Sequence, residues 1–247
     1  MDKLPPGRAL WEPSSGIDKY GTTLALELLP HFTDGRIGSM EGLYFESAAT
    51  TPYHFMVVSA LAKSPSNPVR GLHYRTLADF DLGIAQMRLM GVRYYMAQSE
   101  EAKAAADARS DQLKLVAQTG SDSVAPQVAR WKIYEVLDSP LVEPLRNEPV
   151  VIAGLSHKHW LAPAADWFDD DQALDRPLVD GGPKEWVRAG EKEARFEPKK
   201  PIAKDVTVTN IQTGDDTVSF DVSEPGVPVL VKTSYFPNWG VSGARGP

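Results

Sequence analysis

The sequence predicts an α+β protein in which a central mixed α/β unit with flanking helices precedes an antiparallel β module. In residues 79–97, apolar side chains recur at helical spacing and a run of β-branched and aromatic residues follows. Residues 131–137 alternate between two faces, which is typical of a half-buried strand. After residue 202 the pattern changes to a period of two.

The central unit can be read element by element. The helix within 79–97 should end at Gly91, because glycine adopts the left-handed conformation that caps helix C-termini. Val92–Ala97 then reads as a buried strand. A helix-like stretch at 99–110 and a strand-like run, Leu113–Gln118, lead to the strand at 131–137. The order is therefore helix, strand, helix, strand, strand.

The N-terminal part supplies a further strand and two helices. Arg8–Glu12 is a candidate first strand, and Tyr53–Lys63 is a helix with Pro52 in its first turn. Thr22–Phe32 is predicted as an amphipathic helix. Its buried face would be formed by Leu24, Leu28 and Phe32.

We expect three segments along the chain. Residues 1–154 form the α/β domain, and residues 155–201 form an inserted, loop-rich helical segment and linker, rich in proline and carboxylates. Residues 202–247 form the antiparallel module, with two alternating strands around a turn at 214–216 and a third strand at 227–235. A sandwich-like module truncated at residue 247 would expose an edge strand.

Composition narrows the class of protein. The 247 residues carry a net charge of −7, which argues against a nucleic-acid partner. The chain contains no cysteine, so disulfides and thiolate metal sites are excluded. The N-terminus has no signal-peptide pattern, and no apolar run approaches the roughly 20 residues of a membrane-spanning helix. We therefore expect a water-soluble polypeptide.

Residues 35–54 are the most unusual local sequence, with glycines, carboxylates, tyrosines and a histidine but no periodicity. Such loops often line binding sites, although a surface loop with aromatic plugs is the simpler interpretation. Carbohydrate sites combine apolar ring faces with a few polar groups. The candidate substrate-binding residues are Trp11, Glu12, Glu41, Glu46, Tyr53, His54 and Trp239.

No catalytic residue, cofactor or metal ligand is assigned. Nucleotide-binding and serine-hydrolase motifs are absent from the sequence. Two histidines at 157 and 159, followed by Asp166 and 169–171, have the residue types of a metal site, but a solvated acidic loop is the favoured interpretation.

Three short motifs resemble a known class. Residues 91–97, GVRYYMA, are followed by WKIYEV at 131–136 and by VLVKTSYFPNWG at 229–240. Their order is similar to the extracytoplasmic part of bacterial membrane proteins of the YfhO-like, GT-C-type glycosyltransferase class. The resemblance covers the middle and the last tenth of the chain.

The resemblance implies a soluble extracytoplasmic segment of a polytopic cell-envelope glycosyltransferase, located at the outer face of the bacterial membrane. The usual catalytic carboxylate of that class lies between membrane helices, so this segment would bind and position a glycan or acceptor. Expected partners are the membrane-embedded remainder of the protein and an envelope glycan or lipid-linked sugar. The alternatives are a free-standing carbohydrate-active hydrolase that uses loop carboxylates and a structural interaction module.

Overall fold

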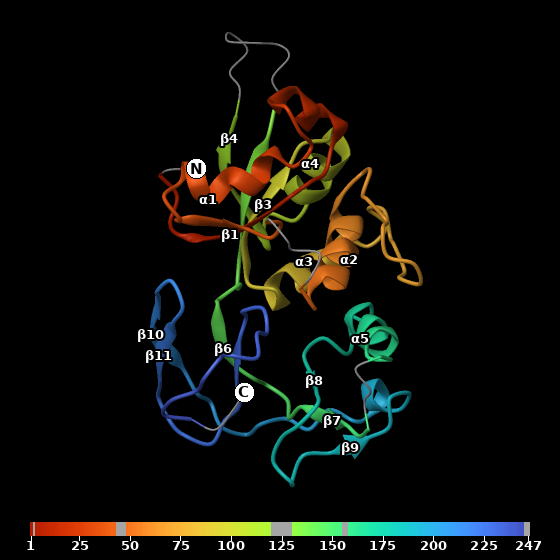
Figure 1. Cartoon of the computed structure of the whole chain (residues 1–247), viewed down its shortest axis with the longest axis vertical. Helices are drawn as coiled ribbons and strands as arrows, with labels where there is room; N and C mark the ends of the chain where they lie inside the picture. Colours follow the sequence, from red (N-terminus) through yellow and green to blue (C-terminus); the bar gives the residue numbers. More distant parts are fainter. Residues whose placement is uncertain (2, 43–47, 120–129, 155–157, 245–247) are drawn as a thin grey trace.

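The structure is a computed structural model that describes residues 1, 3–42, 48–119, 130–154 and 158–244 (Figure 1). Helices, one mixed sheet and smaller sheets occur together, which confirms the predicted α+β class. None of the described helices is long and apolar enough to cross a membrane.

The central sheet has five strands in the order β2-β1-β3-β5-β4. Strand β1 pairs in parallel with β2 on one side and β3 on the other. Strand β5 pairs antiparallel with both β3 and β4, so the sheet is mixed. The strands span β1 Gly7–Trp11, β2 Ile37–Ser39, β3 Val92–Ala97, β4 Leu113–Gln118 and β5 Lys132–Val136.

Three helices carry most of the core that lies against this sheet: α2 (Thr51–Leu61), α3 (Phe80–Leu89) and α4 (Glu100–Asp107). Helix α3 is followed by Gly91 at a φ of 62°, which confirms the predicted helix end. The Ser99 hydroxyl caps α4 by accepting a hydrogen bond from the Ala102 amide.

The predicted buried face of residues 22–32 is wrong. After an earlier 3₁₀ helix, η1 (Ser15–Tyr20), the segment forms one short 3₁₀ helix, η2 (Ala25–Leu28), and one turn of α-helix, α1 (Leu29–Phe32). A 3₁₀ turn has three residues, so side chains four apart no longer share one face. Ala25, Leu26 and Leu29 pack inward instead. The side chains left in solvent are Leu24, Leu28 and Phe32, exposed at 46%, 51% and 71%.

A lower group of elements follows β5 along the chain (Figure 1). Helix α5 (Leu161–Phe168) lies close to α2, and Phe168 belongs to the main core. The segment after residue 157 is therefore packed onto the α/β unit. The remaining elements are β6 Val142–Pro144, β7 Val150–Ile152, β8 Leu178–Val179, β9 Arg188–Ala189, η4 Ala194–Phe196, β10 Val208–Thr213, β11 Val218–Val222 and β12 Val229–Val231.

The third C-terminal strand has a different partner from the one the alternation predicts. Strands β10 and β11 form the expected antiparallel hairpin, but β12 pairs antiparallel with β6. The residue after β12, Lys232, links this pair of strands to the central unit. Its buried ammonium lies 2.9 Å from a Glu143 carboxylate oxygen of β6 and donates to the Arg88 carbonyl of α3.

Candidate functional site

Three polar residues follow the carboxyl ends of the parallel strands. Glu12 follows β1, Glu41 follows β2 by two residues, and Gln98 follows β3. Because these three strands are parallel, their carboxyl ends lie at the same edge of the sheet. Open α/β sheets bind ligands at this edge, where the connections leave a strand in opposite directions.

Glu12 itself is saturated by donors of its own chain. Its side chain is buried, with the residue only 2% exposed. Oε1 accepts from the Lys63 amide at 3.1 Å and from the Ser99 hydroxyl at 2.6 Å. Oε2 accepts from the amides of Gln98 and Ser99, both at 2.8 Å. Glu12 therefore joins β1, β3, α4 and the end of α2, and presents no free oxygen to a ligand.

Trp11, the residue before it, is also internal. It is buried in a cluster that includes Ala9 and Tyr94. Its indole ring packs in the core and offers no surface on which a sugar could stack.

Glu41 and His54 meet as a buried pair. His54 Nε2 lies 2.6 Å from Glu41 Oε1, and both residues are buried. The pair joins the end of β2 to the first turn of α2, as the shared loop at 35–54 suggested. Glu46, the other loop carboxylate, lies outside the described residues.

Tyr53 joins the first turn of α2 to α5. Its ring centroid lies 4.7 Å from that of Phe168 and 6.4 Å from that of Trp160. Burial raises the pKa of Tyr53 to about 12, because the phenolate would lose its hydration. The side chain thus serves mainly to pack the inserted segment on α2.

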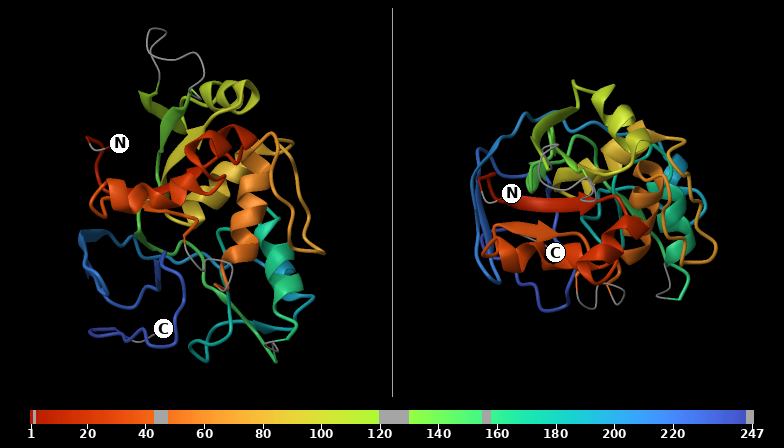
Figure 2. Two further views of the ribbon diagram at one scale, coloured as in Figure 1. Left: turned by 45° about the horizontal axis from the view of Figure 1, so that its top comes forward. Right: turned by 90° about the horizontal axis from the view of Figure 1, so that it is seen from above.

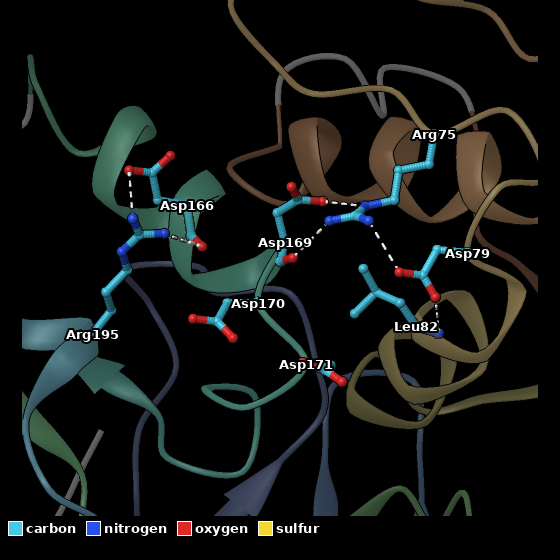
Figure 3. A pocket seen from close by; sticks show the side chains of 8 residues that line it. All are labelled: Arg75, Asp79, Leu82, Asp166, Asp169, Asp170, Asp171 and Arg195. Carbon is cyan, nitrogen blue, oxygen red and sulfur yellow. Dashed lines mark hydrogen bonds and ion pairs between the residues drawn. The ribbon is translucent and has the colours of Figure 1, made fainter.

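A polar pocket of about 410 Å³ lies between α3 and α5 (Figure 3). Arg75 Nε donates to an Asp169 carboxylate oxygen at 2.8 Å, and another Arg75 nitrogen lies 3.0 Å from Asp79 Oδ2. The hydrogen bond with Asp169 raises the pKa of Arg75. Arg195 lines the opposite side of the pocket. The full lining is Arg75, Asp79, Leu82, Asp166, Asp169, Asp170, Asp171 and Arg195.

The aspartates of this pocket do not form a metal centre. Among the described residues, no group of three or more His, Cys, Asp or Glu side chains is placed to hold a metal ion. Asp169 is already engaged by Arg75 and lies 2.8 Å from a ring nitrogen of His73. The histidine at 157 lies outside the described residues.

Sequence reasoning missed the arginines of this pocket. Arg75 and Asp79 form an ion pair across a turn that precedes α3, in which Thr76 and Leu77 have positive φ, so the helical i,i+4 rule gives no signal for it. The partnership of Arg75 with Asp169 spans 94 positions in the sequence and has no local signal.

The C-terminal segment presents an aromatic turn, which we define as Tyr235, Phe236 and Trp239. All three rings are exposed, from 42% for Trp239 to 68% for Tyr235. Trp239 is the only tryptophan of the described chain among the exposed large apolar side chains. The Trp239 indole N–H donates to the Ser234 carbonyl at 3.2 Å, which fixes the direction of the ring.

The aromatic turn lies beside the start of α2. The hydroxyls of Ser234 and Thr50 are 3.4 Å apart, and Thr50 precedes the first residue of α2. The turn is therefore near the helix end that carries Tyr53 and His54. Of the predicted binding residues, Trp239 is the one whose ring is open to solvent.

No protein-family model, curated protein or solved structure matches this chain. Functional inference therefore depends on the residues and their arrangement.

Proposed function

We propose that this chain is the glycan- or acceptor-binding domain of a polytopic cell-envelope glycosyltransferase. It would act at the extracytoplasmic face of the bacterial membrane, while the membrane-embedded remainder of the protein makes the glycosidic bond. The single observation that carries the binding role is the aromatic turn, with three exposed rings in five residues.

The chemistry of the turn suits a sugar. One face of a sugar ring consists largely of C–H groups, which pack on an indole or phenol ring while hydroxyls take hydrogen bonds at the rim. Trp239 is held by its bond to Ser234, so little side-chain freedom is lost when a ligand binds. The nearby Ser234 and Thr50 hydroxyls supply polar partners at the edge of the turn.

The state of Glu12 and Glu41 supports a role without bond cleavage. Glycoside hydrolysis needs two carboxyl groups that flank the scissile bond. Glu12 is saturated by four donors, and Glu41 is paired with His54. The membrane location and the membrane-embedded partner are supported by the motif resemblance at 91–97, 131–136 and 229–240.

Saturation-transfer NMR on the 247-residue chain tests the binding role. The ligands are a panel of pentose and hexose oligosaccharides, as furanosides and pyranosides, and a water-soluble polyprenyl-phosphate sugar. We expect transfer to ring C–H protons of at least one ligand, lost in Trp239→Ala and reduced in Tyr235→Ala. Phe196→Ala is the matched control, because Phe196 is an exposed aromatic residue on η4. Absence of transfer to every ligand, or equal transfer to Trp239→Ala, would overturn the proposal.

The hydrolase alternative has a separate test. A hydrolase of this kind would need a loop carboxylate that is free to act on the substrate. Among the described candidates at the carboxyl edge of the sheet, Glu41 is the one that is not saturated by backbone donors. Incubation with a panel of aryl glycosides should release no phenol above the buffer rate. Release that Glu41→Gln abolishes would favour the hydrolase and displace the binding role.

A further inference from the structure

The aromatic turn belongs to a segment that lies on the surface of the molecule. Every described residue from 234 to 244 is exposed. The C-terminal segment, drawn in blue, lies at the periphery of the molecule in both views of Figure 2. Lys232 is the last buried residue of the described chain, with 5% of its surface exposed. The position of the turn therefore depends on what holds Lys232.

Lys232 is held through its backbone and through its side chain. Its amide donates to the Leu141 carbonyl at 2.9 Å, and its carbonyl accepts from Arg8 Nη1 at 3.2 Å. Its ammonium lies 2.9 Å from a Glu143 carboxylate oxygen and donates to the Arg88 carbonyl at 2.7 Å. These partners belong to or adjoin β6, β1 and α3, so one residue is tied to three elements.

The end of α3 suits these cations. The last carbonyls of a helix have no partner within it and carry the negative end of its dipole. Lys232 donates to the Arg88 carbonyl, and Arg8 Nη1 donates to the Met90 carbonyl at 2.5 Å. Gly91 allows the close approach, because an added Cβ would lie 3.1 Å from Lys232 Cβ. Helix α3 therefore provides a fixed point for the C-terminal segment.

The path from this fixed point to the aromatic turn is short. Thr233 and Ser234 alone separate Lys232 from the first ring of the turn. The Ser234 carbonyl accepts from the Trp239 indole at 3.2 Å. The hydroxyls of Ser234 and Thr50 are 3.4 Å apart in an exposed position, which is long for two hydroxyl groups and contributes little. Lys232 is thus the nearest buried anchor of the turn.

We propose that Lys232 is the residue that positions the aromatic turn beside the start of α2. The proposal rests on the proposed function, because it concerns the surface to which a glycan or acceptor would bind. It adds a residue that acts through the placement of the rings and not through contact with the ligand.

The contacts of the ammonium favour a role in position over a role in stability. Burial lowers the pKa of Lys232, because the ammonium loses its hydration. Removing the ammonium leaves Glu143 in contact with water, since 35% of its side chain is exposed. The relief of a buried charge and the loss of its ion pair therefore largely offset each other in stability. Apolar contact has no direction, whereas an ammonium donates to fixed acceptors, so the ammonium fixes the path of the chain toward Ser234.

A spin label beside the start of α2 measures the position of the turn. The chain contains no cysteine, so a nitroxide attached to Ala49→Cys, at an exposed position next to Thr50, labels one site. We expect this label to broaden the indole N–H resonance of Trp239 in NMR spectra, because Ser234 lies at Thr50 and accepts from that indole. The resonance is identified by its loss in Trp239→Phe.

Lys232→Met keeps the unbranched stem and removes the ammonium. In this variant most of the broadening of Trp239 should be lost, while the urea midpoint and the indole resonances of the other five of six tryptophans stay in place. Lys200→Met is the matched control, because it removes the ammonium of an exposed ion pair with Glu148 and should keep the broadening. A sugar that shows saturation transfer with the wild type should bind Lys232→Met about tenfold more weakly, since the rings must then be ordered on binding.

Each outcome decides the proposal. Absence of broadening in the labelled chain, or equal broadening or equal sugar affinity in Lys232→Met, would overturn it. A shift of all six indole resonances together would assign Lys232 to general stability instead. If Lys232→Met does not fold, Glu143→Gln weakens the same contact at a partly exposed residue, and the proposal fails unless the broadening falls there. A chain that binds no sugar but loses the broadening in Lys232→Met would remove the proposed function and keep the positioning role.

Discussion

Removal of the Glu12 side chain is the perturbation with the largest expected effect on stability. The carboxylate accepts four hydrogen bonds from two separate parts of the chain, one from Lys63 and three from the adjacent Gln98 and Ser99. Glu12→Ala would leave three backbone amides and one hydroxyl without an acceptor in a buried position.

The expected loss in the free energy of unfolding follows from the number of donors that lose their acceptor. Each buried donor without a partner costs about 1–3 kcal/mol. Three amides therefore predict a loss of roughly 3–6 kcal/mol in the free energy of unfolding, with entering water limiting the upper end. Glu12→Gln keeps one oxygen for the amides of Gln98 and Ser99, but sets its NH₂ against the Lys63 amide. We expect it to cost about 1–3 kcal/mol.

Urea unfolding followed by circular dichroism and tryptophan fluorescence measures these losses. The matched control is Glu101→Gln, which removes the same charge at an exposed carboxylate paired with Lys63 and should leave the urea midpoint nearly unchanged. If Glu12→Ala does not fold, Glu12→Gln still gives a measurable midpoint. A Glu12→Gln variant as stable as Glu101→Gln would refute the view that this carboxylate holds the edge of the sheet together.

Two further predictions concern α2 and α3. The pKa of Tyr53 is about 12 in the folded chain against 10.0 for an ordinary tyrosine, so its stabilising contribution is complete below pH 10 and is lost between pH 10 and 12. The stability difference between wild type and Tyr53→Phe should therefore fall by roughly 2–3 kcal/mol over that range in urea titrations, and a constant difference would contradict the burial of the phenol. Gly83 of α3 faces α2 so closely that an added Cβ would lie 2.7 Å from side-chain atoms there, and Gly83→Val should lower the unfolding free energy by about 2 kcal/mol or more. Gly181→Val, at a position with open space, should be near neutral in thermal melts, and equal effects would contradict close packing of the two helices.

The central strands and helices were predictable because their signals are local. The apolar repeat of α3, its terminal Gly91 and the alternation of β5 each lie within a few residues. The face of residues 22–32 was not predictable in this way. A four-residue repeat assumes one continuous α-helix, whereas this segment is divided between η2, a 3₁₀ helix, and the single α-helical turn of α1.

The candidate site residues also differ in whether a local sequence signal or only a tertiary contact reveals their role. The loop at 35–54 suggested Glu41 and His54 together, and the structure joins them at 2.6 Å. Glu12 has the residue type of a catalytic acid, and only its four donors reveal an internal anchor. The exposure of Trp239 likewise depends on where the last segment is packed.

The sequence by itself determined the α+β class, the order of the central elements and the end of α3 before Gly91, because hydrophobic period and capping act between near neighbours. Tertiary structure alone decided that β12 pairs with β6 and that Arg75 meets Asp169 across 94 positions. It also decided that Leu24, Leu28 and Phe32 face outward. These outcomes depend on which distant surfaces bury one another, and that competition leaves no mark in a short stretch of sequence.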